Sequence, residues 1–158
     1  MHDSVMGWVA GEVAGHGLAA RHVLEVGSLD VNGSVRPLFA GPYTGVDMRS
    51  GPGVDVVAFA DALPFPDSSF DVVVSTEMLE HDPSPWLSLA EMGRVLRPGG
   101  HLVLTTRGNG FGEHLEPGDY WRFMPGARGR LLELAGCDAV TMALDPEVPG
   151  IFVHGVRR

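Results

Sequence analysis

Apolar residues along the chain gather in short runs, and polar or glycine-rich segments separate one run from the next. Short apolar runs that end on turn residues are typical of buried parallel strands. We therefore predict about seven strands, at residues 22–27, 43–47, 54–60, 70–75, 101–106, 139–144 and 151–156.

Helical signals occupy the segments between several of these runs. Apolar residues at three- and four-residue steps predict an N-terminal helix within residues 1–20. Ser34 and Ser84 are placed to cap helices, a short one before the second strand and a longer one over 85–96. A further helix is predicted over 125–135. Strands that alternate with helices form a mostly parallel sheet with helices on both faces, which is an α/β architecture.

The connection between the last two predicted strands is short, because only residues 145–150 separate them. A parallel crossover needs about a dozen residues or more, so the last strand is expected to run antiparallel to its neighbour. We expect this last strand to be exposed at the sheet edge, where a second copy can pair with it. A homodimer is therefore plausible.

Composition limits the partners that this chain can have. Its 158 residues suit a single domain, 1–158, without an internal repeat. The formal net charge is −9 and no basic stripe is visible, which argues against nucleic acid and against an anionic membrane surface. Neither a signal peptide nor an apolar run of membrane-span length is recognisable. Cys137 has no disulfide partner and is expected to be buried, so a cytoplasmic location is predicted.

Acidic residues stand at or just after the ends of four successive strands: Glu25, Asp47, Asp61 and Glu77. In an open parallel sheet, ligands bind outside the carboxyl ends of the strands. A rim of carboxylates attracts a cationic ligand, whereas a pyrophosphate requires backbone N–H groups at a helix N-terminus. The sequence therefore predicts a site for a cationic small molecule at this edge.

The order and spacing of these residues, with the Leu-Arg-Pro-Gly-Gly turn at 96–100, resembles the class I S-adenosylmethionine-dependent methyltransferases. The chain looks most like their small-molecule members with a methyltransferase type 11 domain. The resemblance covers residues 20–156 and implies a Rossmann-like fold with an antiparallel last strand. It also implies S-adenosylmethionine as cofactor and S-adenosylhomocysteine as product.

Two groups of residues match the positions at which this family holds the methionyl part of the cofactor. In the first motif, glycine lets the backbone approach the ligand closely. The fourth motif lies near the methionyl amine and the path to the acceptor. The resemblance assigns these roles to Glu25, Gly27 and Ser28 in the first motif, and to Ser75, Thr76 and Glu77 in the fourth.

Other positions match the family's contacts with the nucleoside. Asp47 corresponds to the acidic residue that binds both ribose hydroxyls, about twenty residues after the glycine turn. Met48 is expected against the adenine ring. Asp61 is expected to accept from the adenine amino group, and the Ala62 N–H to meet a ring nitrogen, with Leu63 next in the same segment.

The chain departs from the family pattern in two places. Leu29 and Val31 stand where further glycines are usual, so we expect Asn32-Gly33 to supply the positive-φ turn. Only residues 49–53 separate the second and third strands. No helix fits there, and the third strand is expected to be short.

The acceptor side is predicted from residues that follow the fourth and fifth strands. His81 follows Glu77 and Glu80, and a Glu-His pair can act as a general base; the alternative is a solvated acidic loop. His81 and Asp82 also make half a metal site, but no third ligand is apparent, so no metal is expected.

Residues 107–124 form a long loop that we interpret as a substrate lid, since loops of this length are usually functional or disordered. His114 is a candidate base and Tyr120 a candidate orienting group within it. The alternative is that the aromatic residues of the loop only pack it onto the core.

The prediction is a methyltransferase that moves a methyl group to a small-molecule acceptor, for instance a sugar or a secondary metabolite. One alternative is a cofactor-binding methyltransferase-like module without independent catalysis. A nicotinamide-dependent oxidoreductase is a second alternative, but it requires a Gly-x-Gly-x-x-Gly turn that residues 27–33 lack.

Overall fold

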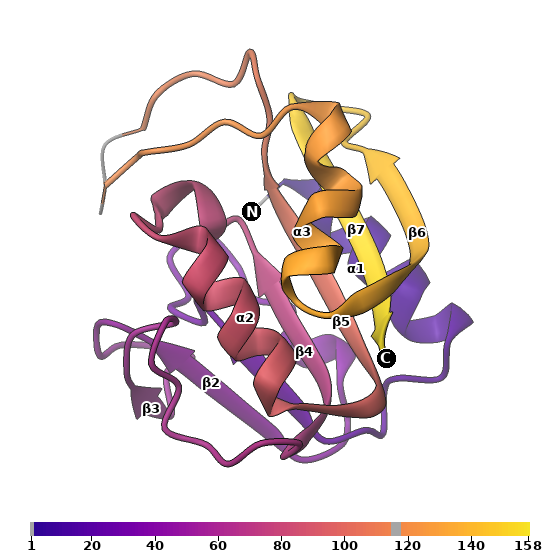
Figure 1. Cartoon of the computed structure of the whole chain (residues 1–158). Coiled ribbons are helices and arrows are strands. Elements are labelled where there is room, and N and C mark those ends of the chain that lie inside the picture. Colours follow the sequence, from indigo (N-terminus) through magenta and orange to yellow (C-terminus); the bar gives the residue numbers. More distant parts are fainter. Residues whose placement is uncertain (1, 115–117) are drawn as a thin grey trace.

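The computed structural model describes residues 2–114 and 118–158. Seven strands form one sheet in the order β3-β2-β1-β4-β5-β7-β6 (Figure 1). The predicted strand number and α/β class are therefore confirmed. The strands are β1 Val23–Val26, β2 Tyr43–Asp47, β3 Val56–Val57, β4 Phe70–Thr76, β5 Leu96–Arg107, β6 Cys137–Leu144 and β7 Gly150–Arg157.

Strand β7 runs antiparallel to both of its neighbours, β5 and β6, while β1 to β5 pair in parallel. The predicted direction of the last strand is confirmed. Its predicted place at the sheet edge is wrong, because β7 lies between β5 and β6 and the edge strand is β6. The physical reason is burial. Ile151, Phe152 and Val153 are all buried, and a strand with apolar side chains on both faces is best shielded from water inside the sheet.

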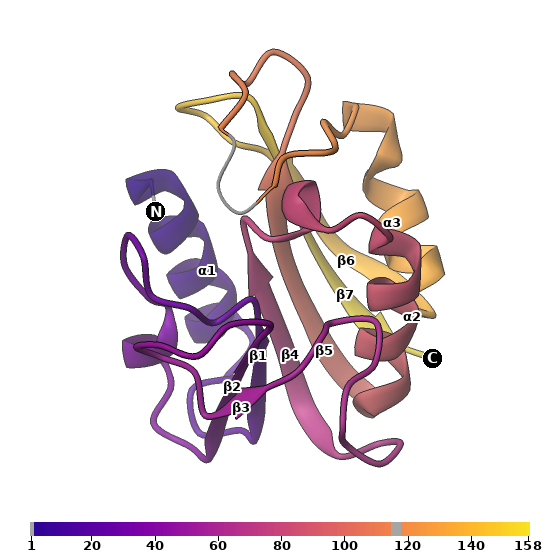
Figure 2. The ribbon, with the colours of Figure 1, turned by 90° about the vertical axis from the view of Figure 1, so that its left-hand side faces the viewer.

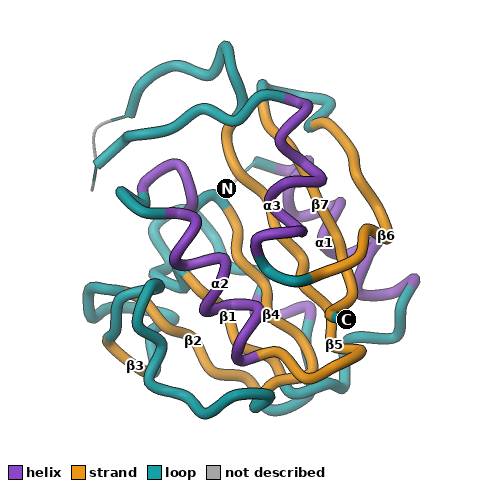
Figure 3. The backbone as a smooth tube through the Cα atoms, viewed as in Figure 1, coloured by secondary structure: helices purple, strands orange, loops and turns teal. Residues whose placement is uncertain are grey.

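Helices cover both faces of the sheet, as predicted. Figure 2 shows α1 (Asp3–Gly15) on one side of the sheet and α2 (Pro85–Val95) with α3 (Arg128–Leu134) on the other. Figure 3 shows the loops that join these elements, including the long loop between β5 and α3 at the top of the view. The described residues also contain three short 3₁₀ helices: η1 Arg36–Leu38, η2 Leu79–His81 and η3 Pro125–Ala127. Among these described helices, none is long and apolar enough to cross a membrane.

The alternation of side chains along the central strands divides the interior into two cores, because successive residues of a strand point to opposite faces. Val72 and Val74 of β4 pack on the α1 side with Val9. Val73, which stands between them, packs on the α2 side with Leu89. The apolar run at 70–75 is therefore buried on both faces, which explains why it contains so few polar positions.

One predicted helix boundary and one predicted helix cap need correction. The N-terminal helix ends at Gly15 and not near residue 20, because Gly17 turns the chain at φ +64° and the Leu18 N–H donates to the Val13 carbonyl at 2.9 Å. Ser84 precedes α2 as predicted, but its side chain makes no capping hydrogen bond. Asp82 Oδ1 instead accepts from the Ser84 N–H at 2.8 Å.

Two predicted elements are shorter than expected. The segment after Ser34 forms only the single turn η1, in which Ser34 Oγ accepts from the Arg36 N–H at 3.1 Å. The strand predicted at 54–60 contains only Val56 and Val57. Beyond it the chain leaves the sheet edge, and residues 58–61 form a wall of the pocket described below. The connection from β2 to β3 contains no helix, as predicted.

Candidate active site

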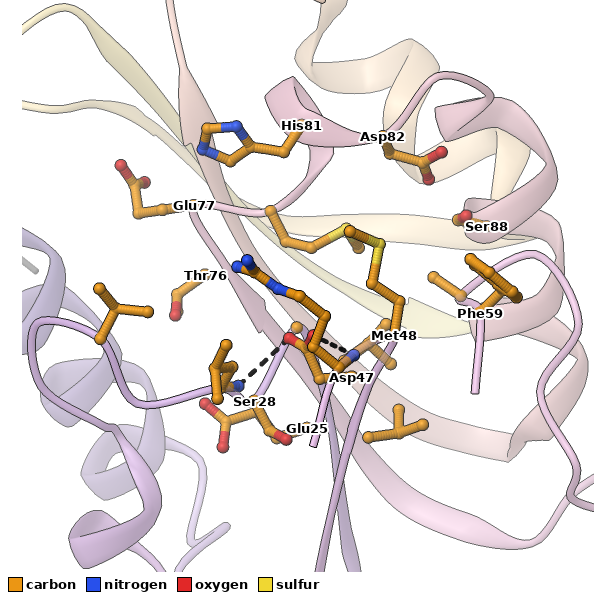
Figure 4. Close-up of a pocket in the computed structure, with 18 of the residues that line it drawn as sticks. Glu25, Ser28, Asp47, Met48, Phe59, Thr76, Glu77, His81, Asp82 and Ser88 are labelled. Atoms are coloured by element: carbon orange, nitrogen blue, oxygen red, sulfur yellow. Dashed lines mark hydrogen bonds between the residues drawn. The ribbon is translucent and has the colours of Figure 1, made fainter. Parts of the chain in front are cut away.

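A pocket of about 480 Å³ opens at the carboxyl edge of the sheet, where β1, β2 and β4 end (Figure 4). Its walls come from the segments that follow β1, β2, β3 and β4 and from part of the 107–124 loop. A volume of this size suits a ligand of nucleoside dimensions. The pocket therefore lies where an open parallel sheet is expected to bind its ligand.

Glu25 lies in β1 and lines the floor of this pocket. Only 3% of the residue is exposed, and Tyr43 donates its hydroxyl to Glu25 Oε2 at 2.9 Å. Burial raises the pKa of the Glu25 carboxyl to about 7, against the opposing effect of the Tyr43 hydrogen bond. A buried carboxylate of this kind favours a ligand that brings a positive charge.

The turn after β1 depends on Gly27, whose φ is +82°. A side chain here would place its Cβ 2.5 Å from Met78 Cγ, and the Gly27 N–H donates to the Val46 carbonyl at 2.9 Å. Ser28 follows and also lines the pocket. Gly33 adopts φ +113°, so the structure has the positive-φ turn that was predicted for Asn32-Gly33.

Asp47 ends β2, and its carboxylate is fixed by two backbone donors. The Leu29 N–H reaches Asp47 Oδ2 at 3.2 Å and the Arg49 N–H reaches Oδ1 at 3.0 Å (dashed lines in Figure 4). Each oxygen retains lone pairs for a ligand. Leu29, which stands where the family usually has glycine, thus ties the first loop to the second strand.

The part of the pocket beside Asp47 is largely apolar. Met48 and Phe59 are 45% and 65% exposed and both line it, together with Asp61. Ala62 and Leu63 are not among the lining residues. Leu63 is buried, and its N–H donates to Glu91 Oε2 at 2.9 Å. Their contacts with an adenine ring remain a prediction.

Glu77 follows the end of β4 in an unusual backbone conformation, with φ +55°. Its Oε1 accepts from Thr105 Oγ1 at 2.8 Å, and its Oε2 pairs with Arg107. Positive φ in a residue other than glycine is costly and is held by its surroundings. Thr76 and Glu77 line the pocket, while Ser75 is buried in the sheet and is not among the lining residues.

His81, His114 and Tyr120 meet at the other end of the pocket. The imidazole rings of His81 and His114 lie edge to face with centroids 4.5 Å apart. His81 Nδ1 contacts the Gly118 carbonyl, and the Tyr120 N–H donates to the Glu80 carbonyl at 2.8 Å. The structure therefore brings together all three residues that were predicted on the acceptor side.

The alternative of a solvated acidic loop requires Glu80 to be exposed to water, and the structure shows otherwise. It is fully buried, and Thr106 Oγ1 donates to Glu80 Oε2 at 2.7 Å. Glu80 Oε1 lies 4.0 Å from His81 Nε2. That alternative is wrong for Glu80, and its carboxylate faces the histidine pair.

The described part of the 107–124 loop overhangs the acceptor end, and residues 115–117 of the predicted lid lie outside the described residues. Asp119 and Arg122 form an ion pair within it, and this pair lowers the pKa of Asp119. Trp121 Nε1 donates to the Asp82 carbonyl at 2.8 Å, which joins the loop to the segment after η2. Phe123 packs against the core, whereas Tyr120 and Trp121 are exposed.

The sequence interpretation missed several pocket residues. Phe59 and Ser88 line the pocket, but nothing in their local pattern separates them from ordinary loop or helix residues. Arg107 was missed as well. It is 2% exposed and pairs with Glu77 and with Asp145 at 3.1 Å. A charged residue at the end of an apolar strand was the available signal, because a buried charge requires partners.

A seven-stranded sheet with an inserted antiparallel strand, helices on both faces and an acidic pocket at its carboxyl edge define a class I Rossmann-like methyltransferase fold. Proteins of this class use S-adenosylmethionine as methyl donor. Residues 10–104, more than half of the chain, match the family described as "Methyltransferase domain", and the chain belongs to this family. The resemblance drawn from the strand ends and the 96–100 turn is confirmed.

The chain is also similar to curated methyltransferases of longer sequence. An uncharacterized methyltransferase of Mycobacterium avium (strain 104) is 40% identical over 107 residues, which cover 58% of this chain and 42% of that protein. The phthiotriol/phenolphthiotriol dimycocerosates methyltransferase 1 of Mycobacterium ulcerans (strain Agy99) is 41% identical over 103 residues, covering 56% and 38%. The matched region thus spans less than half the length of these relatives.

A solved structure with the same fold is the 1,6-didemethyltoxoflavin-N1-methyltransferase of Burkholderia thailandensis. That crystal structure holds 1,6-didemethyltoxoflavin and S-adenosylhomocysteine. It superposes with a TM-score of 0.79 at 18% identity, over 97% of this chain and 78% of that chain. At this level of identity, the likeness establishes the fold.

Proposed function

We propose that this chain binds S-adenosylmethionine in the pocket at the carboxyl edge and transfers its methyl group to a small-molecule acceptor. The observation that carries the proposal is the placement of Glu25, Asp47 and Glu77 around one pocket of nucleoside size. The sulfonium and ammonium groups of the donor are cationic, so the acidic lining favours their binding. The membership in the methyltransferase family supports the same reaction.

In this proposal each strand end has its own part of the donor to bind. Gly27 and Ser28 approach the methionyl part, with Glu25 beneath them, and Thr76 and Glu77 lie near the amine. Asp47 accepts from both ribose hydroxyls through the lone pairs that its backbone donors leave free. Met48 and Phe59 hold the adenine by apolar contact, and Asp61 accepts from its amino group.

The acceptor occupies the end of the pocket that His81, His114 and Tyr120 line. The bond between sulfur and the methyl carbon breaks as the acceptor atom forms its own bond to that carbon. The products are S-adenosylhomocysteine, the methylated acceptor and, from a hydroxyl or amine, one proton. Because the sulfonium already activates the carbon, alignment of the two reactants supplies much of the acceleration. The imidazoles and Tyr120 orient the acceptor and handle its proton.

The acceptor class follows from charge and from the relatives. A net charge of −9 disfavours nucleic acid. The similar proteins are named as methyltransferases of phthiotriol/phenolphthiotriol dimycocerosates and of 1,6-didemethyltoxoflavin. We propose a small metabolite such as a sugar or a secondary metabolite as acceptor, in the cytoplasm. For a homodimer we propose pairing through β6, the longer of the two edge strands, on which Val140, Met142 and Leu144 are exposed.

Titration calorimetry with S-adenosylmethionine tests the donor site. We expect binding by the unaltered protein and about 10- to 100-fold weaker binding by Asp47→Asn, because a charge-assisted pair of hydrogen bonds is lost. Asp138→Asn, an exposed carboxylate on the edge strand, is the matched control and is expected to bind normally. Binding of NADH with none of S-adenosylmethionine would contradict the proposal.

A turnover assay distinguishes an active methyltransferase from a cofactor-binding module without catalysis. We expect release of S-adenosylhomocysteine when a panel of hydroxylated and amine-bearing small molecules is supplied. A protein that binds the donor but releases no S-adenosylhomocysteine with any acceptor is the cofactor-binding module.

A further inference from the structure

We propose that Glu80, His81 and His114 hold a divalent first-row transition-metal ion at the acceptor end of the pocket. The catalytic use of this ion rests on the proposed function. The proximity of the three side chains does not depend on which reaction the protein catalyses. Each of them offers one ligand atom, and these atoms all lie within 4.8 Å of one another. Two ligands of one ion, each about 2.1 Å from it, are separated by at most ~4.2 Å, so only a small closure is needed.

Glu80 provides an anionic ligand that is poorly satisfied without a cation. The residue is fully buried, and Thr106 satisfies Oε2 alone. Within the described part of the chain, Glu80 Oε1 is buried and has no hydrogen-bond partner. A buried carboxylate oxygen without a partner is costly, and a bound cation removes that cost. His81 Nε2, at 4.0 Å, is beyond hydrogen-bonding distance of this oxygen.

The tautomer of His81 favours metal binding as well. Its Nδ1 contacts the Gly118 carbonyl, which can only accept a hydrogen bond. The proton of the neutral ring is therefore on Nδ1, and Nε2 presents a lone pair toward Glu80 Oε1. Histidines that bind metals almost always donate their other ring N–H to a carbonyl or carboxylate in this manner.

His114 brings the third ligand from the loop after β5. Its Nδ1 lies 3.4 Å from Asp119 Oδ2, and Asp119 in turn pairs with Arg122. The Asp119 carboxylate also accepts the His114 backbone N–H at 2.7 Å. This arrangement orients the imidazole through a carboxylate, which is the usual support of a metal-binding histidine.

Two histidines and one carboxylate leave coordination positions open, and this ligand set suits first-row metals such as Mn²⁺, Fe²⁺ or Zn²⁺. His81 and His114 line the pocket, so the open positions face the space assigned to the acceptor. A hydroxyl oxygen of the acceptor can coordinate there. With the ion bound, the ion and not a free imidazole activates this hydroxyl, because it lowers the pKa of the hydroxyl so that the proton leaves to solvent. The alkoxide or phenolate oxygen then displaces sulfur from the methyl carbon. The inferred substrate class is thus a hydroxylated acceptor that is methylated on oxygen.

A second cluster, which α1 and β7 contribute to, provides a comparison. Glu12, His16 and His154 also place ligand atoms within 4.8 Å of one another. There, however, His154 Nδ1 and Glu12 Oε2 are hydrogen-bonded at 2.6 Å, and His154 Nε2 lies 2.8 Å from His101 Nδ1. The atoms that would bind an ion already satisfy one another. This cluster is a structural network of the α1 face and supplies the control.

The test is metal binding by chelator-treated protein, measured calorimetrically with ZnCl₂, MnCl₂ and MgCl₂ in turn. We expect one Zn²⁺ or Mn²⁺ per chain and much weaker binding of Mg²⁺. His114→Ala is expected to weaken binding at least 10-fold, and Glu80→Gln by a similar factor. His16→Ala is the matched control and is expected to bind the metal as the unaltered protein does. Because Glu80 is buried, His114→Ala on the loop keeps the test valid if Glu80→Gln does not fold.

Binding of S-adenosylmethionine by the same metal-free samples separates the two proposals. We expect it to be unchanged by the chelator and by His114→Ala, since the donor residues lie at the other end of the pocket. No Zn²⁺ or Mn²⁺ binding, or binding that His16→Ala removes and His114→Ala does not, overturns the metal site while the donor site stands. Metal binding as expected without any binding of the donor overturns the proposed function and leaves the metal site.

Discussion

Glu25 and Asp47 stand at the ends of neighbouring strands, but their surroundings differ. Glu25 is 3% exposed, and burial raises the pKa of its carboxyl to about 7. Asp47 is half-buried and accepts two backbone hydrogen bonds. A carboxyl that titrates near neutral pH gains a charge when a cation binds beside it. At the scale of the residue, Glu25 is therefore the group that we expect to couple donor binding to protons.

Binding of S-adenosylmethionine is expected to weaken about 10-fold between pH 8 and pH 6. Below pH 7 the free protein carries Glu25 as the neutral acid, and this proton must leave before the cationic donor binds beside a carboxylate. Calorimetry at the two pH values measures the effect. Glu25→Gln is expected to bind more weakly at pH 8 and to lose most of the pH dependence. A profile that is as steep in this variant as in the unaltered protein contradicts the assignment.

The same group predicts an effect on stability. The pKa of Glu25 is raised on folding from 4.5 to about 7, so the folded protein holds this proton more tightly than the unfolded chain. Its contribution to stability is present below pH 4.5 and is lost as the pH rises through 7. Glu25→Gln is therefore expected to raise the melting temperature at pH 8 more than at pH 5. Differential scanning calorimetry checks this, and an equal shift at both pH values argues against the raised pKa.

Gly27→Ala is expected to destabilise the protein by about 1–2 kcal/mol and to weaken donor binding. Position 27 requires φ +82°, and the added Cβ would lie 2.5 Å from Met78 Cγ in the pocket wall. Urea denaturation and donor titration measure the two effects. Gly7→Ala is the control, because nothing lies within 4 Å of a Cβ there and α1 gains a better helix former. A Gly27→Ala protein as stable as the unaltered chain would show that the turn can adopt another path.

At the scale of elements, η2 and the 107–124 loop form one wall of the pocket although they are distant in sequence. The Tyr120 and Trp121 N–H groups donate to the Glu80 carbonyl, and the Phe123 N–H donates to the Arg107 carbonyl at 3.0 Å. Arg122 organises the loop itself, through Asp119 and the carbonyls of Phe111 and Gly112. Apart from Phe123, which packs against the core, the described part of this loop is therefore held mainly by a few polar contacts.

Arg122→Met is expected to speed backbone hydrogen exchange at least 10-fold in residues 108–113 and 119–123, since the contacts that hold the loop are lost. Hydrogen exchange with mass spectrometry measures it. Exchange in β1 and β4 and the affinity for S-adenosylmethionine are expected to stay the same, because the donor residues do not contact Arg122. Arg130→Met, which removes an exposed pair with Glu133, is the control and is expected to leave the loop unchanged.

On the scale of the whole molecule, the ion pairs of Arg107 connect the pocket to the hairpin that β6 and β7 form. It ends β5 and is almost fully buried, and it pairs with Glu77 beside the pocket and with Asp145 after β6. The Gly108 N–H donates to the Pro149 carbonyl nearby, which holds the β6–β7 turn against the same point. The last hairpin, which lies outside the pocket, thus supports the conformation of Glu77 at φ +55°.

Arg107→Met is expected to lower the free energy of unfolding by about 3–5 kcal/mol, because two carboxylates then lack their buried counter-charge. The double variant Arg107→Met/Asp145→Asn is expected to recover part of this loss, and chemical denaturation measures both. A loss of less than about 1 kcal/mol in the single variant contradicts the buried network, since exposed pairs contribute that little.

The strand ends and turns were predictable because their signals are local. Short apolar runs located the strands, and the carboxylates at or just after their ends, Glu25, Asp47 and Glu77, all line the pocket. Gly33 has the positive φ that was predicted for the Asn32-Gly33 turn. The six residues between the last two strands required a reversal of direction. Each of these conclusions depends on neighbours within a few positions, where covalent geometry and periodicity decide.

Only the tertiary structure decided which distant segments meet. The apolar pattern of β7 indicates that it is buried but does not show that it enters between β5 and β6. His81 with Asp82 looked like half a metal site, and the sequence offered no third ligand. Hydrogen bonds from Tyr120 and Trp121 to Glu80 bring the loop back over η2, and His114 then lies beside His81. Contacts between distant segments depend on long-range packing and hydrogen bonding, which local sequence patterns do not predict.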